Sequence, residues 1–176
     1  MLSSVLSGPD LPALPDGWLL SRLEELAEIN PESLSITTPS NYLFRYIDLS
    51  AVEKGAIDWS LVQETNFRDA PSRARRLVRP DDVLFGTVRP SLQSHGAIPS
   101  SKTNPLVAST GFAIIRARSG EAIGRFLFHT VMADLFGMQA RRTEVGSNYP
   151  AVNESDVRLF LVAHPSLSEQ RRIAEI

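Results

Sequence analysis

Residues 70–96, APSRARRLVRPDDVLFGTVRPSLQSHG, contain the pattern that says most about the fold. Residues 82–89 (DVLFGTVR) are rich in β-branched and aromatic side chains and end at Pro90, which predicts a short strand. Residues 66–80 show little periodicity and include Pro71 and Pro80, which indicates an Arg-rich loop. A short strand bounded by proline, beside an irregular basic segment, favours a domain built from many short strands.

The same alternation of short strands and breaks continues on both sides of this stretch. Strands are predicted at residues 42–49, 56–61, 96–98, 106–108, 111–117 and 157–163. A capping box formed by Ser21 and Glu24 predicts a short helix that ends at Pro31. Apolar residues at steps of three and four predict one long amphipathic helix over residues 121–140. Because the strands and helices mix without regular βαβ order, we expect an α+β domain of many short twisted strands with one long amphipathic helix.

Length and composition describe one ordinary globular domain. The chain has 176 residues, of which 43% are hydrophobic and 22% charged, enough to form a core. It has no cysteine, which excludes disulfides, thiolate metal sites and cysteine nucleophiles. No apolar run approaches the ~18 residues of a membrane helix, and the N-terminus does not resemble a signal peptide, so a cytoplasmic protein without membrane partners is expected. Residues 1–13, with two prolines and no periodicity, are expected to be a flexible lead-in.

The charges are unevenly distributed along the chain. The net charge of −2 is the average of −7 over residues 1–66, +7 over residues 67–142 and −2 over residues 143–176. Sixteen of the eighteen basic residues are arginine, the side chain suited to bidentate recognition of phosphates and guanine edges. A GC-rich genome explains the arginine excess equally well, but it does not explain the basic middle segment.

The sequence lacks the motifs of a self-sufficient active site. It contains no phosphate-binding loop, no dinucleotide-binding fingerprint and no nucleophile elbow. The positions two before Lys54 and Lys102 are not acidic, which excludes a metal-nuclease motif of the (D/E)xK kind. The adjacent carboxylates Asp81 and Asp82 follow a proline and are expected to form a turn rather than a metal site. We therefore expect a protein with no catalytic residues, no metal and no cofactor of its own.

The basic segment is compatible with a nucleic-acid surface. Arg73, Arg75, Arg76, Arg79 and Arg89 lie within seventeen residues, with serine, threonine and glutamine between them. Guanidinium groups bind phosphates while short polar side chains complete the register on a duplex. Few aromatic residues interleave with these arginines, which favours double-stranded over single-stranded DNA. On composition alone, an Arg-rich solvated loop is an equal alternative.

Several ordered features of the chain resemble the target-recognition domain of type I restriction-modification specificity subunits. The resemblance runs from about Leu14 to the end, and each piece is weak alone, but the pieces occur in the family's order. They are Leu14-Pro15-Asp16-Gly17-Trp18, Tyr46-Ile47-Asp48-Leu49, residues 70–76 and 82–90, Ala108-Ser109-Thr110-Gly111-Phe112, residues 147–150, Ser155-Asp156, and Glu169-Gln170 with Ile173.

The resemblance implies a non-catalytic component that reads one half of a bipartite double-stranded DNA target. It implies a recognition domain over residues 14–165 and, at residues 166–176, the start of a conserved spacer helix that stops at Ile176. The implied partners are DNA methyltransferase subunits, which bind the S-adenosylmethionine, and a restriction subunit. A homodimer through the spacer helix is implied if that helix continues. Glu169, Gln170 and Ile173 are the residues of this helix expected to bind a partner.

Two other interpretations remain open from the sequence. The chain is alternatively a protein-interaction module or decoy that binds methyltransferase subunits without reading DNA. It is alternatively a recognition domain detached from a single-chain methyltransferase-nuclease.

Individual roles on DNA are hypotheses. Arg73, Arg75 and Arg76 are expected to face the sugar–phosphate backbone, although alternate arginines would reach guanine instead. Arg89 is expected either to read a base or to form an ion pair with Asp82, and Gln93 is a candidate adenine reader. The remaining candidates are Lys102, as a phosphate contact or none, and a second polar loop at Ser147, Asn148 and Tyr149. For Tyr149, a half-buried ring packed beneath that loop is the slightly preferred alternative.

Overall fold

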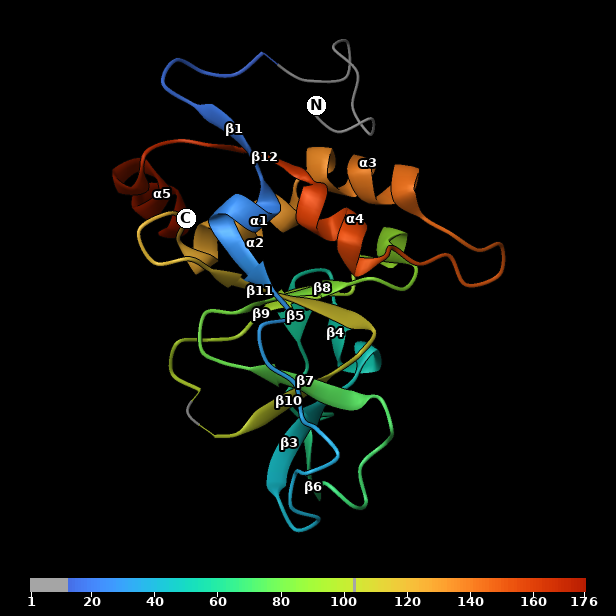
Figure 1. The fold of residues 1–176 in the computed structure, drawn as a ribbon. Helices are drawn as coiled ribbons and strands as arrows, with labels where there is room; N and C mark the ends of the chain where they lie inside the picture. The colour runs from blue at the N-terminus through green and yellow to red at the C-terminus, as the bar shows by residue number, and fades with distance from the viewer. Residues whose placement is uncertain (1–12, 103) are drawn as a thin grey trace.

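The computed structural model describes residues 13–102 and 104–176. The lead-in expected at residues 1–13 falls, apart from Ala13, outside the described residues. The domain has three layers, which are stacked from top to bottom in Figure 1 as helices, a four-stranded sheet and a second four-stranded sheet. The predicted α+β class with many short strands is therefore confirmed.

The middle sheet is buried on both faces. Its strands, each antiparallel to its neighbour, are in spatial order β2 (Ala27–Ile29), β11 (Phe112–Ala117), β8 (Val83–Gly86) and β9 (His95–Ala97). Successive side chains of a strand point to opposite faces. Ala113 and Ile115 accordingly join the core under the helices, while Phe112 and Ile114 join the core between the two sheets. This double burial explains why the first four residues of β11, Phe112 to Ile115, are all apolar.

The lower sheet combines antiparallel and parallel pairing. Its strands are, in spatial order, β6 (Gln63–Asn66), β3 (Leu43–Ile47), β10 (Leu106–Ser109) and β7 (Ala74–Val78), with β3 and β10 parallel. Ile47 and Leu106 face the middle sheet, and Phe44 and Val107 form a smaller core on the opposite face. Between the sheets lie a one-turn 3-10 helix, η2 (Leu49–Ala51), and a small hairpin of β4 (Val52–Glu53) and β5 (Ala56–Ile57).

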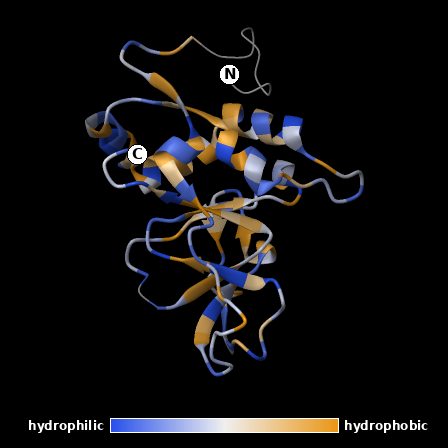
Figure 2. Ribbon diagram, viewed as in Figure 1, coloured by the Kyte–Doolittle hydropathy of each residue, from blue (hydrophilic) through white to orange (hydrophobic). Residues whose placement is uncertain are grey.

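Five helices and a strand pair form the upper layer. The elements are β1 (Leu19–Arg22) paired with β12 (Leu161–His164), and the helices α1 (Leu23–Leu26), α2 (Gly124–Met132), α3 (Asp134–Thr143), α4 (Glu154–Leu159) and α5 (Leu167–Ala174). Phe85 of β8 packs edge-on against Phe136 and Phe160, with ring centroids 5.2 and 6.4 Å apart, and so joins the sheet to the helices. Figure 2 shows hydrophobic segments in the middle sheet and in the helices above it, and also along strands of the lower sheet. No helix in the described part of the chain is long and apolar enough to span a membrane.

The helix predicted from Ser21 to Pro31 is wrong. Only one turn, α1, is helical, and it lies between strands β1 and β2. The carboxylate that accepts the N-terminal amide is that of Glu25, bonded to Arg22 N at 2.6 Å, rather than the predicted Glu24. The segment is short, and its pairing with β12 and β11 outweighs the weak preference of a few residues for helix.

Two further segments differ from prediction. The loop predicted at residues 66–80 contains β7, which pairs with β10 along the edge of the lower sheet. The strand predicted at residues 157–163 begins instead with α4, and only its last part becomes β12. Glu154 and Asp156 in the first turn of α4 suit the positive end of a helix, a signal that the apolar run after them obscured.

The single long helix predicted at residues 121–140 is two helices. Ala133 adopts extended backbone (φ −78°, ψ 151°) and separates α2 from α3. The break redirects α3 so that Phe136 and Ala140 reach the same core as Phe126 and Leu127 of α2. The apolar spacing therefore predicted the helical residues correctly, but not the break at Ala133, which depends on the shape of the core.

The terminal helix α5 docks on its own domain. Gln170 is 1% exposed; its amide accepts from Ile123 N at 3.1 Å and donates to Pro165 O at 3.1 Å, while Ile173 packs against the upper core. The side chain of Ser166, which precedes the helix, makes no capping hydrogen bond. Two of the three residues expected to bind a partner, Gln170 and Ile173, thus face inward, whereas Glu169 is only partly covered.

Candidate nucleic-acid interface

The turn that joins β8 to β9, residues 87–94, is held in an unusual conformation. Arg89 (φ 47°, ψ 58°) and Gln93 (φ 53°, ψ 41°) are both left-handed and flank η3 (Pro90–Leu92), a single 3-10 turn. A left-handed non-glycine residue costs about 1–3 kcal/mol and persists where the surroundings hold it, often at functional sites. The strand ends at Gly86 rather than at Arg89, and after it Thr87 donates its amide and hydroxyl to Gly111 O, each at 2.9 Å, while Val88 bridges to Ala151. We call residues 87–94 the reading turn.

The predicted polar loop at Ser147, Asn148 and Tyr149 lies against the reading turn. Arg89 N donates to Pro150 O at 2.8 Å, and its side chain donates to Asn148 O at 3.1 Å. The Arg89 guanidinium carbon lies 4.5 Å from the centre of the Tyr149 ring. The structure thus brings together two candidate segments that are about sixty residues apart in the chain.

Two expectations for this contact are wrong. Arg89 does not pair with Asp82, because the Asp82 carboxylate is occupied by Arg116 and the backbone amide of Arg79. The Tyr149 ring is not half-buried beneath the loop but 70% exposed, on the surface beside Arg89.

Gln93 lies beside a shallow groove next to the reading turn. The groove has a volume of about 420 Å³ and is lined by residues of η2, the β4–β5 hairpin and the reading turn, among them Ser50, Lys54, Ser91 and Gln93. Lys54 N donates to Gln93 O at 2.8 Å, which joins the two walls of the groove. Gln93 is exposed, as a base-contacting side chain must be.

Arg73 lies on the other side of this groove. Its backbone carbonyl accepts from Thr110 N at 2.8 Å, so it adjoins the β10–β11 turn that also holds Thr87. Its guanidinium donates to the Tyr46 hydroxyl and forms an ion pair with Asp48, the residue before η2. The segments before β7, between β10 and β11, around η3 and before α4 all lie on the right-hand side of Figure 1.

Arg75 and Arg76 are strand residues rather than loop residues. Arg75 lies over the Phe67 ring at 5.0 Å and donates to the Ala74 carbonyl. Arg76 points toward α4, where it lies 3.7 Å from a Glu154 carboxylate oxygen, and its side chain is 24% exposed. Successive residues of β7 point to opposite faces, so these arginines do not share one surface as the loop prediction required.

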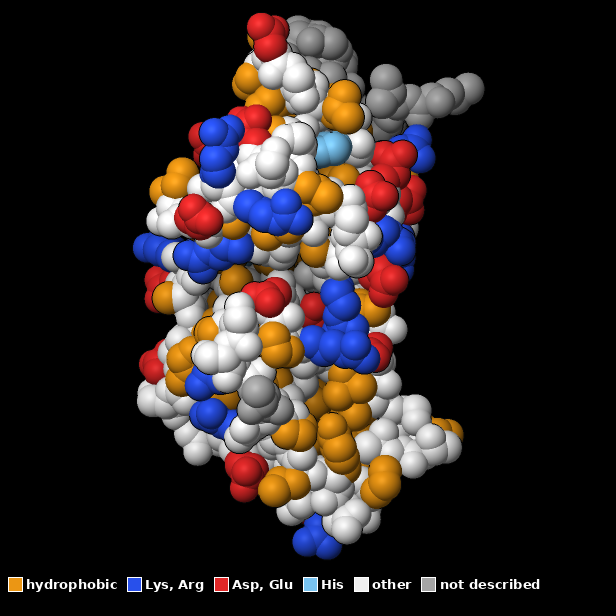
Figure 3. Space-filling view, turned by 90° about the vertical axis from the view of Figure 1, so that its left-hand side faces the viewer, with side chains coloured by type: hydrophobic (Ala, Val, Ile, Leu, Met, Phe, Trp, Pro, Cys, Tyr) orange, Lys and Arg blue, Asp and Glu red, His pale blue; other side chains and the backbone are white. Residues whose placement is uncertain are grey.

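Lys102 lies apart from the other candidates. Lys102 belongs to the segment that leads into β10, and its ammonium is 4.3 Å from the centre of the Trp59 ring. Arg73, in contrast, contacts Thr110, the residue after β10. The face shown in Figure 3, which is the left-hand side of Figure 1, has basic side chains interspersed with acidic ones and a strip of hydrophobic side chains in its lower part. That face lacks the uniform basic character expected of a DNA-binding surface.

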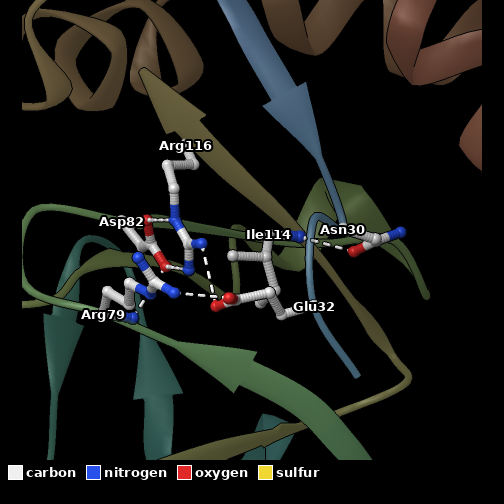
Figure 4. Close-up of polar contacts among 6 residues, drawn as sticks. All are labelled: Asn30, Glu32, Arg79, Asp82, Ile114 and Arg116. Atoms are coloured by element: carbon white, nitrogen blue, oxygen red, sulfur yellow. Dashed lines mark hydrogen bonds and ion pairs between the residues drawn. The ribbon is translucent and has the colours of Figure 1, made fainter. Parts of the chain in front are cut away.

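An ionic network centred on the buried Asp82 holds the opposite end of β8 (Figure 4). Arg116 donates to both oxygens of Asp82, at 2.9 and 2.8 Å, and to Glu32 at 3.0 Å; Glu32 also pairs with Arg79. The hydrogen bond from Arg116 lowers the pKa of Glu32 below its usual value, against the opposing effect of burial, with Arg79 contributing further. Sequence analysis missed Glu32 and Arg116 because they lie 84 and 34 residues from their partners, beyond the range of any spacing motif.

His95, which follows the reading turn, provides a pH-dependent prediction. Burial lowers the pKa of His95 from 6.5 to about 4, and the neutral ring accepts from Gly86 N at 3.1 Å while stacking on Phe85. Between these two pKa values only the unfolded chain takes up the proton, so the free energy of unfolding should fall as pH drops from 6.5 toward 4. Urea titrations of the wild-type protein and His95→Gln across this range will test this. The free energy of unfolding of the variant should depend less on pH, and equal pH dependence in the two proteins would contradict a role for His95. Glu32 also titrates, but it does so at lower pH and in both proteins alike.

The chain is similar to solved HsdS structures. An HsdS subunit from Thermoanaerobacter tengcongensis is 37% identical with a TM-score of 0.81, and the match covers 96% of this chain and 42% of that one. A chain from a structural study of complex assembly and conformational transition in the type I R-M system is also 37% identical with a TM-score of 0.81, covering 94% of this chain and 42% of the other. No protein-family model and no curated protein matches the sequence.

The match accounts for nearly all of this chain and for less than half of each HsdS chain. It supports the expectation that the chain is a specificity component rather than an enzyme. The motifs, the layered fold and the match at 37% identity agree that the chain is a target-recognition domain of the kind found in type I restriction-modification specificity subunits.

Proposed function

We propose that this domain reads one half of a bipartite double-stranded DNA target for a type I restriction-modification complex. The observation that carries the proposal is the surface formed by the reading turn, the loop at residues 144–151 and Arg73. It presents two arginines, an exposed glutamine and polar loop residues on one side of the domain. Arginine and glutamine are the side chains that pair with guanine and adenine edges in the major groove.

The proposal includes partners that carry out the chemistry. DNA methyltransferase subunits, which bind S-adenosylmethionine, and a restriction subunit would act at the site that this domain selects. The likeness to a chain from a type I complex supports partner subunits in general. Because Gln170 and Ile173 pack inward, we propose that a partner contacts the outer face of α5 rather than these two residues.

The direct test of the proposal is a salt titration of binding to a random-sequence duplex. A single small domain buries only ~600–1,000 Å² on DNA. We therefore expect weak binding, with a Kd of about 10⁻⁴ to 10⁻⁶ M near physiological salt, that weakens steeply as salt rises. Fluorescence anisotropy with a labelled duplex measures both quantities. Binding that is absent or independent of salt would contradict the proposal.

Arg73→Ala should weaken binding to all duplexes alike and reduce the slope of log K against log[salt] by about 0.9, the value for one phosphate contact. The Arg73 side chain is 57% exposed, so its guanidinium can exchange Asp48 for a phosphate. Arg118→Ala is the matched control, because Arg118 is also exposed and paired with a carboxylate, that of Glu28, but follows the opposite end of β11. Equal salt slopes for the two variants would exclude Arg73 from the interface.

A further inference from the structure

The Arg89 guanidinium is held by neutral partners that leave donors available. An arginine has five N–H donors in a planar fork. Stacking on Tyr149 uses the face of the group and none of these donors, and Asn148 O takes one N–H from Nη2. The remaining donors include an adjacent pair that matches O6 and N7 on the major-groove edge of guanine.

Arg73 provides an instructive contrast on the same surface. Its Nε donates to the Tyr46 hydroxyl and its Nη2 to the Asp48 carboxylate. A neutral base edge is a weaker acceptor than the Asp48 carboxylate and would not displace it from Arg73. A phosphate is an anion and can take its place, so Arg73 suits a phosphate contact better than a base contact. The charge of Arg89 faces a ring and a carbonyl instead, and so remains available.

The backbone around Arg89 is fixed from both sides. Its amide donates to Pro150 O, the next residue is Pro90, and its left-handed φ of 47° sets the direction in which the side chain leaves the turn. The loop that carries Tyr149 is closed by two hydrogen bonds between Val145 and Ala151, at 2.9 and 3.0 Å. A side chain held in advance loses less conformational entropy on binding.

Packing in the core does not explain the position of Tyr149, because most of its ring is exposed. With 70% of its surface exposed, the ring contributes little to the core, and its described contact is the Arg89 guanidinium. Resting on the proposed function, we infer that Arg89 recognises a guanine edge in one base pair of the target, and that Tyr149 is the positioning residue that orients it. The loop at residues 144–151 then determines which base pair Arg89 reaches.

The experiment selects binders from a pool of 24-base-pair duplexes of random sequence with the full chain, sequences them, and measures salt slopes on the same pool. The wild-type protein should favour guanine at one position. Arg89→Ala removes the fork, and because the inferred contact is to a base rather than to a phosphate, the salt slope should stay constant while that preference falls by about 5- to 150-fold. Tyr149→Ala should reduce the preference by about 2- to 5-fold with the salt slope unchanged. Tyr149→Phe, which keeps the ring, should stay within about twofold of the wild-type protein.

Each alternative outcome is decisive. Guanine preference that survives Arg89→Ala overturns the inference, as does an Arg89→Ala loss spread over all sequences. If Tyr149→Phe behaves like Tyr149→Ala, the stacked ring is not what positions Arg89. Salt-dependent wild-type binding without any guanine preference refutes this inference alone, whereas no wild-type binding refutes the proposed function as well. Thermal melting of each variant separates these effects from loss of folding.

Discussion

Asp82→Ala should lower the free energy of unfolding by about 3–5 kcal/mol, one of the two largest effects expected for this domain. The Asp82 side chain is 1% exposed, and its carboxylate accepts two hydrogen bonds from Arg116 and one from Arg79 N at 2.7 Å. Removing the carboxylate leaves the Arg116 guanidinium, which is only 18% exposed, without its main counter-charge. A buried charge that loses its partner keeps its desolvation cost, so the loss exceeds that of a surface pair. Urea unfolding followed by circular dichroism measures it.

Glu28→Ala is the control for this prediction. Glu28 also pairs with an arginine of the same region, Arg118, at 3.4 Å, but the two side chains are 50% and 42% exposed. Solvent screens such a pair, and the expected change is below about 1 kcal/mol. Similar losses for the two variants would show that burial of the Asp82–Arg116 pair does not determine its contribution.

Phe85→Ala should destabilise the domain by about 3–5 kcal/mol through the cavity it creates. Phe85 is fully buried, contacts Phe136 and Phe160 of the helical layer, and stacks on His95 with ring centroids 4.7 Å apart. The substitution removes most of the contact that joins β8 to the helices. Phe85→Leu keeps much of the apolar volume and should cost less than about half as much.

Phe85→Ala should also weaken DNA binding, because β8 leads directly into the reading turn. Leu92→Ala is the control for stability: the Leu92 side chain is 58% exposed, so the free energy of unfolding should change by no more than about 0.5 kcal/mol. If Phe85→Ala unfolds at the wild-type urea concentration, the aromatic contacts do not hold the layers together.

The strands that were predicted best are those buried on both faces. β8 (VLFG) and the first four residues of β11 (FAII) are short apolar runs that end or begin at a glycine, a pattern consistent with a strand buried on both faces. β7 was missed because three of its five residues, Arg75, Arg76 and Leu77, are partly exposed at the edge of a sheet, and its two adjacent arginines place a charge on each face. Only pairing with β10 makes this segment a strand.

The candidate site was predicted in its parts but not in its arrangement. Arg89, Gln93 and the polar loop at residues 147–149 were identified as candidates by residue type. Their proximity depends on the bridges from Val88 and Val145 to Ala151, which no local pattern indicates. The pairing of Asp82 with Arg116 instead of Arg89 follows from strand register, since β8 and β11 lie side by side.

The sequence by itself determined the fold class, the basic middle segment and the absence of recognisable catalytic motifs, because composition, periodicity and residue type are local properties. It also carried enough ordered motifs to indicate the family. The tertiary structure alone decided which arginines are neutralised by carboxylates and which one stacks on an exposed tyrosine. The physical reason is distance along the chain: Arg89 and Asn148 are 59 residues apart, and only the packing of three layers brings such groups into contact.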